Sequence, residues 1–380
     1  MTSFAERAAR GVARCTPDDF DDLRRFQAEE YGDRAGLVPT AWLEWLQRNP
    51  QRAADGVPVW ICRRDGRVVG QQAEIAARLR VGPAEVAAAY PIELMVNERW
   101  RLRGVGPALA AAQRDASRVS CAIWMTDEMH RLYERAGWID LGSVPRFVAV
   151  ARASAVARSL ESPARRAGAA AAVPFVAAGS LAAVSVGRAR APSTRLVEVA
   201  RFDDRADAVW TRACVDYGVL ARRDAASLRW RFDESPFAGR YRRFYLLHGE
   251  EAVGYAVLRA TRWRQAASLR VVDYLAPRRF VSPLLTSCLV LARRDRSTAF
   301  VDLLTRNDRS RRELLTLGFL PAERLPWFRD HAVAMRLMVA VGEDDPLRGA
   351  LGDAGSWFVT GGEADVDLVE MQLEAMGDLG

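Results

Sequence analysis

The chain has 380 residues, half of them hydrophobic and 27% charged, so it is long enough for two or three domains with hydrophobic cores. All 55 basic residues are Arg, which indicates the coding bias of a high-GC genome. The net charge of +7 therefore favours a solvated Arg-rich surface over a nucleic-acid site, and the sequence carries no zinc knuckle, helix-turn-helix or RNA-binding signature. We expect no nucleic-acid partner.

The cysteines and histidines exclude further classes of protein. The five Cys are scattered and form no Cys-x-x-Cys pair, which is typical of reduced thiols in the cytoplasm rather than of a disulfide framework. His130, His248 and His331 show no metal-ligand spacing, so we expect no metal site and no His-based triad. The first residues lack the apolar core of a signal peptide, and we expect a cytoplasmic protein.

The first 150 residues alternate between helix and strand signals. Thr16-Pro17-Asp18-Asp19 caps a helix that runs to about Tyr31, and residues 39–49 form a second helix. Asp65-Gly66 is a tight turn between two strands. The further elements of this half, in chain order, are strands 57–64, 67–80 and 86–96, a helix 107–117, a strand 121–125, a helix from 128 and a strand 144–150.

Residues 151–195, rich in Ala, Arg and Ser, connect this half to the next. Within them, Ala167–Val186 carries no charge and is long enough to cross a membrane. Its composition is mostly Ala, with Pro and Gly inside, so its hydrophobic drive is modest. We predict an interdomain helix or linker and no membrane span, while weak contact with a membrane surface stays open.

The second half repeats the landmarks of the first in the same order. Each half has a Trp before a hairpin, a Val-Gly pair that ends the hairpin block and a later Gly-aromatic pair, at near-equal spacings. The landmarks are Trp45, Gly70 and Gly137 in the first half, and Trp230, Gly254 and Gly318 in the second. We therefore predict an α/β protein of two related domains, each a twisted mixed β-sheet flanked by helices. The expected boundaries are 1–150 and 196–345, with the linker 151–195 between them and an acidic tail 346–380.

Arg101-Leu102-Arg103-Gly104-Val105-Gly106 is the most informative stretch, because it joins an expected strand to an expected helix. A glycine-rich turn in this place bares backbone N–H groups, and the helix start adds partial positive charge. This arrangement predicts a seat for a phosphate or pyrophosphate. About thirty residues later, Tyr133 stands four residues before the pair Gly137-Trp138.

Together the two motifs resemble those of the GNAT superfamily of acyl-CoA N-acyltransferases. That family has Arg or Gln, two residues, Gly, one residue and Gly or Ala, followed later by a Tyr four residues before a Gly-aromatic pair. The resemblance covers roughly residues 10–150. It implies two GNAT-like domains, acyl-CoA, in the first place acetyl-CoA, as co-substrate, and transfer of the acyl group to the primary amine of a small molecule.

The resemblance also implies roles for individual residues. The backbone of the turn would hold the pyrophosphate, and Arg99, Arg101 and Arg103 would add positive charge. An N–H near Met95 or Val96 would polarise the thioester carbonyl. The predicted cofactor-binding residues are Met95, Val96, Arg101, Arg103, Gly104, Val105, Gly106 and Ala108.

Tyr133 matches the family's general acid, which protonates the departing thiolate, although a Tyr packed on an amphipathic helix is the competing interpretation. Glu93 is the predicted general base, because carboxylates on this strand often serve so in the family. Strand alternation places Glu93 with Met95, so it is structural if the cofactor lies on the opposite face. Asp127, Glu128 and a chain of waters are the alternatives.

The second half departs from the pattern where chemistry would be done. Asp273–Phe280 stands at the place of the phosphate turn without Gly-x-Gly, and Leu314 replaces the Tyr. We expect this domain to keep the fold without the cofactor, so that one chain binds one CoA, and to shape the acceptor site or an interface instead.

The sequence also suggests an acceptor for the reaction, and it leaves two other functions open. Trp230-Arg231-Phe232 resembles a segment of tandem GNAT-like proteins encoded near bacterial polysaccharide genes, which suggests an amino sugar as acceptor. One alternative is a pseudo-enzyme that senses acyl-CoA or acts as a scaffold. The other is a tRNA-dependent aminoacyl transferase, against which the retained phosphate turn argues.

Overall fold

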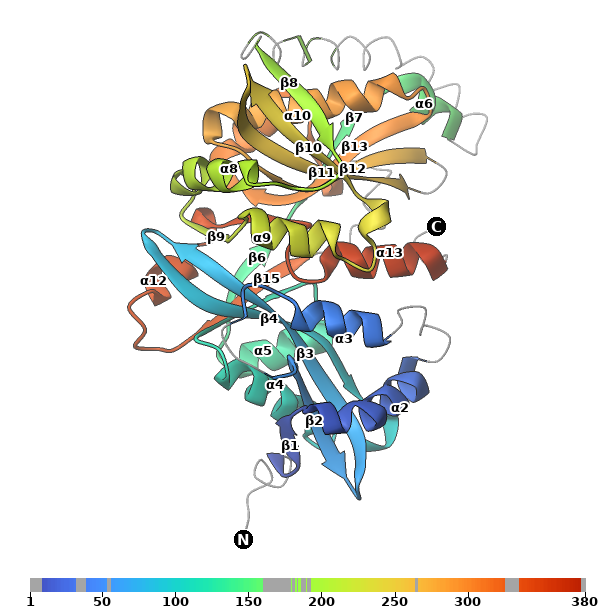
Figure 1. Ribbon diagram of the computed structural model, residues 1–380, viewed down its shortest axis with the longest axis vertical. Helices are drawn as coiled ribbons and strands as arrows, with labels where there is room; N and C mark the ends of the chain where they lie inside the picture. Colours follow the sequence, from blue (N-terminus) through green and yellow to red (C-terminus); the bar gives the residue numbers. More distant parts are fainter. Residues whose placement is uncertain are drawn as a thin grey trace. The chain divides into compact units, whose positions relative to one another are not determined.

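The computed structural model describes residues 9–31, 39–52, 56–159, 193–263, 266–324 and 335–376, together with positions 179, 182, 184, 185 and 189. The chain forms two compact units, each built on its own mixed β-sheet (Figure 1). The first unit consists of Met1–Gly142, Glu234–Pro236 and Arg336–Gly352. The second consists of Ser143–Asp233, Phe237–Met335 and Asp353–Gly380.

The sheet of the first unit places the expected strands side by side. In spatial order they are β1 (Val12–Arg14), β2 (Val59–Arg64), β3 (Arg67–Val81), β4 (Ala84–Val96), β5 (Val119–Ile123), β15 (Arg336–Val341) and β6 (Ile139–Ser143). The tight turn between β2 and β3 has Asp65 and Gly66 at φ 51° and 75°, the left-handed pair that a two-residue hairpin requires. The helices of this unit are α2 (Phe20–Tyr31), α3 (Pro39–Gln47), α4 (Val105–Asp115), α5 (Asp127–Arg135) and α12 (Arg348–Gly352).

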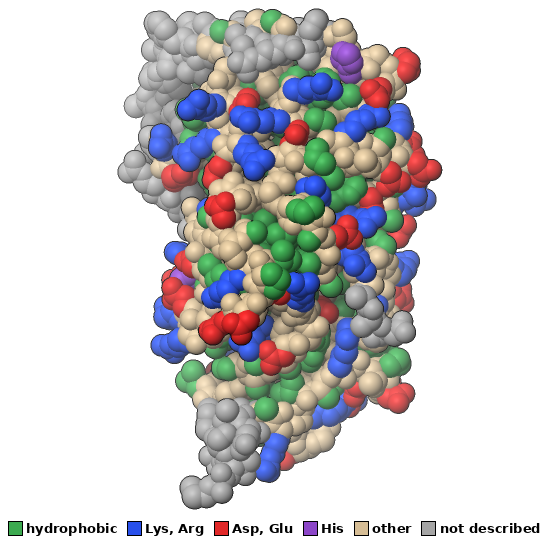
Figure 2. Space-filling view, turned by 90° about the vertical axis from the view of Figure 1, so that its left-hand side faces the viewer, with side chains coloured by type: hydrophobic (Ala, Val, Ile, Leu, Met, Phe, Trp, Pro, Cys, Tyr) green, Lys and Arg blue, Asp and Glu red, His purple; other side chains and the backbone are tan. Residues whose placement is uncertain are grey.

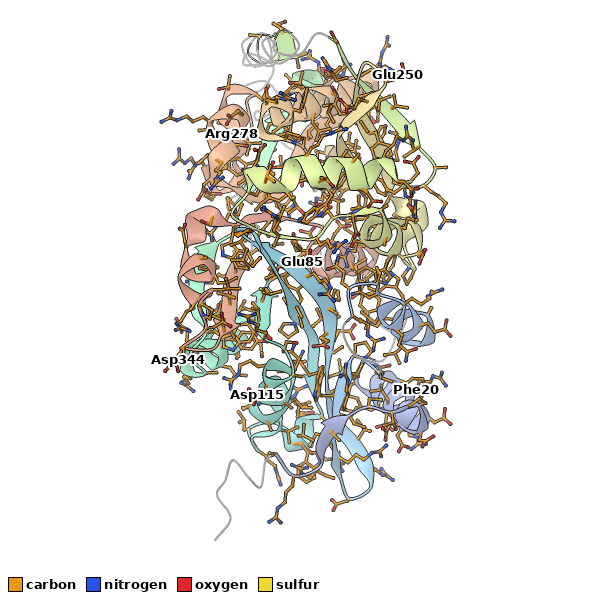
Figure 3. All side chains as sticks on the ribbon, turned by 60° about the vertical axis from the view of Figure 1, so that its left-hand side comes forward. Phe20, Glu85, Asp115, Glu250, Arg278 and Asp344 are labelled. Atoms are coloured by element: carbon orange, nitrogen blue, oxygen red, sulfur yellow. The ribbon has the colours of Figure 1, made fainter. Side chains whose placement is uncertain are left out.

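Helices cover both faces of this sheet. Gln27 of α2 donates a hydrogen bond to Gln71 of β3 at 2.9 Å, and Gln113 of α4 donates one to Glu74 of the same strand at 3.0 Å. Because residues 71 and 74 have opposite parity along a strand, α2 and α4 lie on opposite faces. Figure 3, in which Phe20 of α2 and Asp115 of α4 are labelled, shows the two helices on either side of the strands.

The second unit repeats this plan. In spatial order its strands are β14 (Leu320–Pro321), β7 (Arg146–Val150), β13 (Thr298–Asn307), β12 (Ala266–Leu275), β11 (Glu251–Trp263), β10 (Arg242–His248) and β8 (Thr194–Val199). Short strand β16 (Phe358–Thr360) pairs with β13, and β9 covers Val219–Ala221. The helices are α6 (Ala153–Ser159), α8 (Arg205–Ala213), α9 (Ala225–Leu228), α10 (Arg278–Arg294), α11 (Arg311–Thr316) and α13 (Val366–Met376).

The two halves of the chain exchange one strand each. Strand β7, which ends the expected first domain, pairs with β13 of the second sheet from Val150↔Phe300 to Arg146↔Leu304. Strand β15, from the end of the second half, pairs with β5 of the first sheet from Leu337↔Ile123 to Val341↔Val119. Each unit therefore contains segments from both halves of the sequence, which a division at residues 150 and 196 does not foresee.

Matching details of the two sheets confirm two related folds. Both hairpins carry a register shift at the same place, after Cys62 in β2 and after Leu246 in β10. The loops after α5 and α11 also agree: Trp138 N–H donates to Tyr133 O, and Phe319 N–H donates to Leu314 O, each at 3.0 Å. The expected α/β architecture with two mixed sheets flanked by helices is thus confirmed.

The remaining expectations fall on less regular parts. Strand β6 was not predicted, and the expected acidic tail contains β16 and the buried helix α13. Segment Ala167–Val186 lies largely outside the described residues. Within the described ranges, every helix is too short or too polar to cross a bilayer. On the face drawn in Figure 2, basic and acidic side chains are interspersed, which is what a solvated Arg-rich surface looks like.

Candidate functional site

The candidate site of the first unit begins where β4 and β5 separate. The two strands are parallel neighbours only at Ala88↔Val119 and Ala89↔Ser120. Beyond these pairs β5 continues beside β15, and no strand among the described residues pairs with 91–96 of β4 on that side. The backbone of β4 is therefore open to an extended ligand along the segment that the sequence predicted for it.

A β-bulge shapes this segment of β4. Gln71 pairs with Met95 and Ala73 with Ile92, so two residues of β4, Glu93 and Leu94, face one residue of β3. Glu93 has a left-handed φ of 53°. The buried amide of Gln72 donates to Ile92 O at 2.6 Å, which fixes the bulge from the neighbouring strand. The bulge turns the N–H and C=O groups of β4 away from the regular ladder at the position predicted for the thioester.

The glycine turn follows β4 and starts α4. Gly104 is the N-cap of α4 with φ 82°, a conformation that a side chain would strain. Ala108 N–H donates to Gly104 O at 3.1 Å, and Arg103 N–H donates to Trp100 O at 3.4 Å. Both amides are thus engaged inside the turn. The amides of Val105 and Gly106 stand at the first two helical positions, which have no partner inside a helix, and are the ones left for an anion.

The arginines of the turn make different contacts. Arg101 is exposed and its Nε donates to Val96 O at 3.1 Å, so its side chain folds back over the end of β4. The guanidinium of Arg103 lies over the ring of Trp100, 5.3 Å from the centroid, and Arg64 lies over the same ring at 5.8 Å. Trp100 and Arg64 are participants that the sequence analysis missed. No local sequence signal connects Arg64, at the end of β2, with Trp100, which follows β4, so only the folded structure shows their contact.

Close packing supports the turn from below. A Cβ placed on Gly70 would lie 3.0 Å from Leu109 Cδ1 of α4 and 3.1 Å from Met95 O of β4. A Cβ on Gly106 would meet only Val96 Cγ2 at 3.7 Å and Leu94 Cδ2 at 3.9 Å, which is ordinary contact. Gly70 is therefore needed for α4 to pack on the sheet, whereas Gly106, the second glycine of the motif, has room for one methyl group.

Tyr133 is buried beside these elements. Its side chain is 4% exposed, and its ring stacks on Trp138 with centroids 4.1 Å apart. The two rings belong to a cluster with Ala110 of α4, Ala122 of β5 and Met338 of β15. Burial raises the pKa of the Tyr133 hydroxyl well above its usual value, so it keeps its proton at neutral pH. That hydroxyl makes no hydrogen bond with any residue that the structure describes.

The candidate bases lie at separate places. Glu93 is half-buried in the bulge, where the simple alternation that paired it with Met95 does not apply. Asp127 and Glu128 are exposed in the first turn of α5, whose N-cap is Thr126. Glu74 was not predicted. It is 7% exposed on the α4 face of β3, and burial raises its pKa against the opposing effects of Gln113 and Arg14. It lies between the sheet and α4 and holds that helix in place.

One side-chain cluster resembles a metal site without matching one. His130 Nε2 lies 3.1 Å from Asp140 Oδ2, and His130 Nδ1 lies 3.6 Å from Glu134 Oε2. The three residues bring ligand atoms within 4.8 Å of one another. Arg336 of β15 also contacts Asp140 Oδ2, so a guanidinium already occupies that carboxylate. We interpret the cluster as a polar network, with an ion pair between Arg336 and Asp140, that joins α5, β6 and β15.

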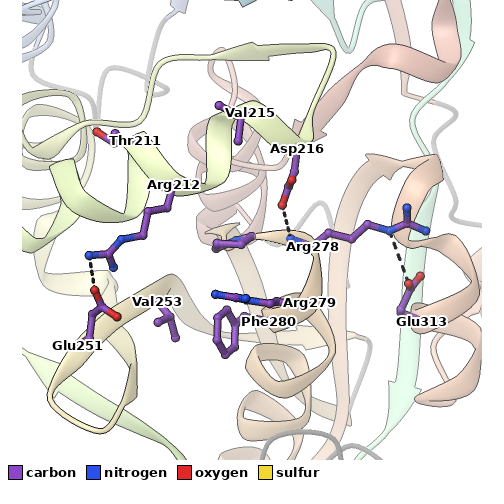
Figure 4. Close-up of a pocket in the computed structure, with 11 residues that line it drawn as sticks. Thr211, Arg212, Val215, Asp216, Glu251, Val253, Arg278, Arg279, Phe280 and Glu313 are labelled. Atoms are coloured by element: carbon purple, nitrogen blue, oxygen red, sulfur yellow. Dashed lines mark hydrogen bonds and ion pairs between the residues drawn. The ribbon is translucent and has the colours of Figure 1, made fainter.

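The corresponding place in the second unit is built differently. Strand β12 ends at Leu275 and α10 begins at Arg278 directly after Pro277, without a left-handed glycine. Asp216 Oδ2 accepts the Arg278 N–H at 2.7 Å, as Figure 4 shows. Leu314, the counterpart of Tyr133, is fully buried and offers no proton. The first unit alone therefore combines an open strand, a glycine turn and a tyrosine.

Solved structures with this fold are found in several organisms. A probable N-acyltransferase from Enterococcus faecalis matches with a TM-score of 0.56 at 10% identity, covering 87% of this chain and 71% of that one. A GCN5-related N-acetyltransferase from Anabaena variabilis matches with a TM-score of 0.54 at 12% identity, covering 87% and 72%. N-myristoyltransferase of Saccharomyces cerevisiae with bound myristoyl-CoA matches with a TM-score of 0.50 at 9% identity, covering 87% and 82%.

No protein-family model matches the sequence. A comparison with curated proteins likewise finds no match. At these identities the solved structures establish the fold, and their coverage spans both sheets. The fold expected from the two motifs is confirmed: the chain consists of two GNAT-like halves that exchange a strand.

Proposed function

We propose that the protein is an N-acyltransferase that moves an acyl group, in the first place acetyl, from acyl-CoA to the primary amine of a small molecule such as an amino sugar. The support is the first unit, which contains the open edge of β4, the glycine turn that starts α4, and Tyr133 packed against Ala110 of α4. Structures of the same fold are named as acetyltransferases, and one holds myristoyl-CoA. The five cysteines are buried free thiols, which supports the cytoplasm as the compartment.

Each part of the site has a task in this reaction. The amides of Val105 and Gly106 bind the pyrophosphate at the start of α4, with Arg101 and Arg103 at its rim. Main-chain groups at Met95 and Val96 hold the arm of the substrate as an added strand and polarise the thioester carbonyl. The acceptor nitrogen attacks this carbon, the carbon–sulfur bond breaks, and the Tyr133 hydroxyl gives its proton to the thiolate. The nitrogen loses its extra proton as the amide forms, and this proton restores the Tyr133 hydroxyl.

The proton of the acceptor ammonium leaves before the attack. Glu93 is the proposed base because it is the carboxylate in the bulge next to Met95. Asp127 and Glu128, exposed at the start of α5, and a chain of waters are the alternative routes for the proton. The buried Glu74 is not proposed as a base, because it lies between β3 and α4.

The single observation that carries the proposal is the divergence of β4 from β5 after Ala89, leading into a left-handed glycine at a helix start. The test is Gly104→Val, which places a branched side chain where φ is 82° and where the phosphate must approach. We expect acetyl-CoA affinity, measured by calorimetry, to fall by at least about 100-fold because the close backbone approach is lost.

Gly82→Val is the matched control. Gly82 also has a positive φ, of 58°, and nothing lies within 4 Å of a Cβ placed there, but it stands in the turn between β3 and β4. Both variants carry a comparable strain of about 1–2 kcal/mol. Acetyl-CoA affinity should survive in Gly82→Val alone. Equal affinity in wild type and Gly104→Val would overturn the proposal, and binding without acetylation of any amine in a panel that includes glucosamine would favour the sensor.

A further inference from the structure

The second sheet has a cleft in the place where the first sheet is open. Strands β12 and β13 run parallel from Ala267↔Thr298 to Val271↔Leu303 and then stop pairing with each other. The first sheet shows the same divergence after Ala89 of β4. In both units, therefore, two neighbouring parallel strands stop pairing with each other and separate.

In the second sheet this cleft is filled by the chain itself. Strand β16 pairs antiparallel with β13 from Thr305↔Thr360 to Asn307↔Phe358. A Cβ placed on Gly361 would lie 3.2 Å from Val272 O of β12 and 3.8 Å from Leu304 Cβ of β13. The segment after β16 thus lies between the two separating strands, where the backbone of Gly361 is close to Val272 of β12.

Buried polar groups hold the segment there. Thr360 is fully buried, and its Oγ1 donates to Asp273 Oδ1 of β12 at 2.6 Å. Thr305 Oγ1 of β13 donates to Val359 O at 2.9 Å. Arg223 bridges Asp273 and Glu363, and all three side chains are buried. Such a set of paired buried charges makes the segment a built part of the unit, since removing one partner leaves an unpaired buried charge.

We propose that the second cleft is a strand-binding site whose permanent occupant is the segment 357–362 of the same chain. In the first unit the proposed function gives the equivalent cleft to the arm of acyl-CoA, and the inference rests on that function to this extent. A peptide strand offers N–H and C=O groups to both walls of the cleft. The second unit therefore keeps the fold and uses its cleft to hold the C-terminal segment, which excludes acyl-CoA.

The start of α10 also differs from the proposed phosphate seat of the first unit. Asp216 accepts the Arg278 N–H at the start of α10, where a phosphate would lie in the first unit, and Pro277 has no N–H to give. The cavity beside it has a volume of about 780 Å³. Figure 4 shows its acidic and basic side chains facing one another in pairs, Arg212 with Glu251 and Arg278 with Glu313. An added diphosphate would meet carboxylates as well as guanidinium groups.

The first arm of the test counts coenzymes. Native mass spectrometry of the full chain with acetyl-CoA should show one coenzyme per wild-type chain and none in Gly104→Val. Two coenzymes in the wild type, with one left in Gly104→Val, would mean that the second cleft accepts the ligand and would overturn the inference. One coenzyme in both proteins would instead count against the proposed function, because the glycine turn would then not hold it. If the wild-type chain binds no coenzyme, the proposed function is wrong instead. The second arm of the test then shows by itself whether the segment 357–362 occupies the second cleft.

The second arm measures hydrogen exchange and needs no ligand. Amides of β16 should exchange as slowly as those of β13, because they are ladder groups of a buried cleft. A Cβ on Gly362 would lie 2.9 Å from Asp273 Cβ, so Gly362→Ala should speed exchange in β16 and the end of β12 by at least about tenfold. Gly239→Ala, with nothing within 4 Å, is the matched control in the same unit. Fast exchange of β16 in the wild type would show that the cleft has no permanent occupant.

Discussion

Tyr133 joins packing and proposed chemistry in one side chain. Its ring is stacked on Trp138 and buried, which is the structural role that a tyrosine on an amphipathic helix was expected to have as an alternative. Its hydroxyl makes no hydrogen bond with the described part of the chain. Packing therefore holds the ring, and the hydroxyl is the part of Tyr133 that remains for the proposed ligand.

Tyr133→Phe separates the two roles. The variant keeps the ring and the stacking, so its free energy of unfolding should stay within about 1 kcal/mol of the wild type. The acetylation rate constant should fall about 100-fold or more, because the proton donor for the thiolate is gone, while acetyl-CoA affinity stays the same. Steady-state kinetics and urea unfolding measure these quantities.

Tyr217→Phe is the matched control for the loss of a buried hydroxyl. Tyr217 OH donates to Ala276 O at 2.8 Å in the second unit, which contains none of the residues proposed for the reaction. This variant should lose about 1 kcal/mol of stability, because a buried carbonyl is left unpaired, and it should keep full activity. If Tyr133→Phe behaves in the same way as Tyr217→Phe, Tyr133 is a packing residue and another group supplies the proton.

At single residues, sequence reasoning worked where the backbone demands one residue type. Gly104 was predicted from the motif, and the structure gives it the left-handed N-cap that only glycine adopts without strain. Glu93 shows where prediction from the sequence failed. Its face was predicted from strict alternation, but the bulge inserts a residue between Ile92 and Met95, and no local signal announced the bulge.

Local elements follow from local signals, whereas strand partners do not. The box of Thr16 and Asp19 starts the first helix as expected, with Thr16 N–H donating to Asp19 at 2.7 Å. Strand β7 was expected near residues 144–150, whereas no strand was predicted at the place of β15, and a short apolar run says nothing about which sheet it joins. Their exchange depends on pairing across about 150 to 220 residues of sequence, which is a tertiary effect.

The exchange has a measurable consequence for β15. Met338 is fully buried and packs with Tyr133 and Trp138 of the first unit, although it comes from the end of the second half. Met338→Ala should cost about 2–4 kcal/mol of unfolding free energy because it leaves a cavity in that cluster. Hydrogen exchange should accelerate in β5 and α5, which share the cluster and the ladder with β15.

Leu320→Ala controls for position. Leu320 is 44% exposed in β14 of the second unit, so its truncation should change stability by no more than about 0.5 kcal/mol. If Met338→Ala instead accelerates exchange in β12 and β13 and leaves β5 unchanged, β15 belongs to the second sheet and the exchange of strands is wrong.

The two units of the molecule share one fold but differ in the charged side chains that they bury. The first unit buries few charged side chains, and Glu74 is the most buried carboxylate on the α4 side of its sheet. The second unit buries a layer of ion pairs between its sheet and α13. Its members are Arg146, Arg259 and Arg270 from the strands, Asp302 from β13, and Asp367, Glu370 and Glu374 from α13.

Asp302 and Glu74 make opposite contributions to the pH dependence of the stability of their units. Burial alone would raise the pKa of Asp302, but Arg270 and Arg146, each 2.8 Å away, outweigh it and hold the pKa below its usual value. A lowered pKa means that its stabilisation is present above about pH 4 and is lost as the pH falls through the folded value. The raised pKa of Glu74 has the reverse sign: stability is highest below about pH 4 and is lost as the pH rises through its folded value.

Two variants test this difference, with hydrogen exchange of β13 and β3 as local readouts between pH 3 and 8. Asp302→Asn should destabilise the second unit by about 3–5 kcal/mol at neutral pH, because two buried guanidinium groups lose their shared carboxylate, and the gap to wild type should narrow in acid. Glu74→Gln keeps an acceptor for Gln113 without the charge, so its advantage over wild type should grow as the pH rises. A Glu74→Gln chain whose β3 exchanges faster than wild type at pH 8, but not at pH 4, would mean that the ionised carboxylate stabilises the first unit and that its burial is compensated.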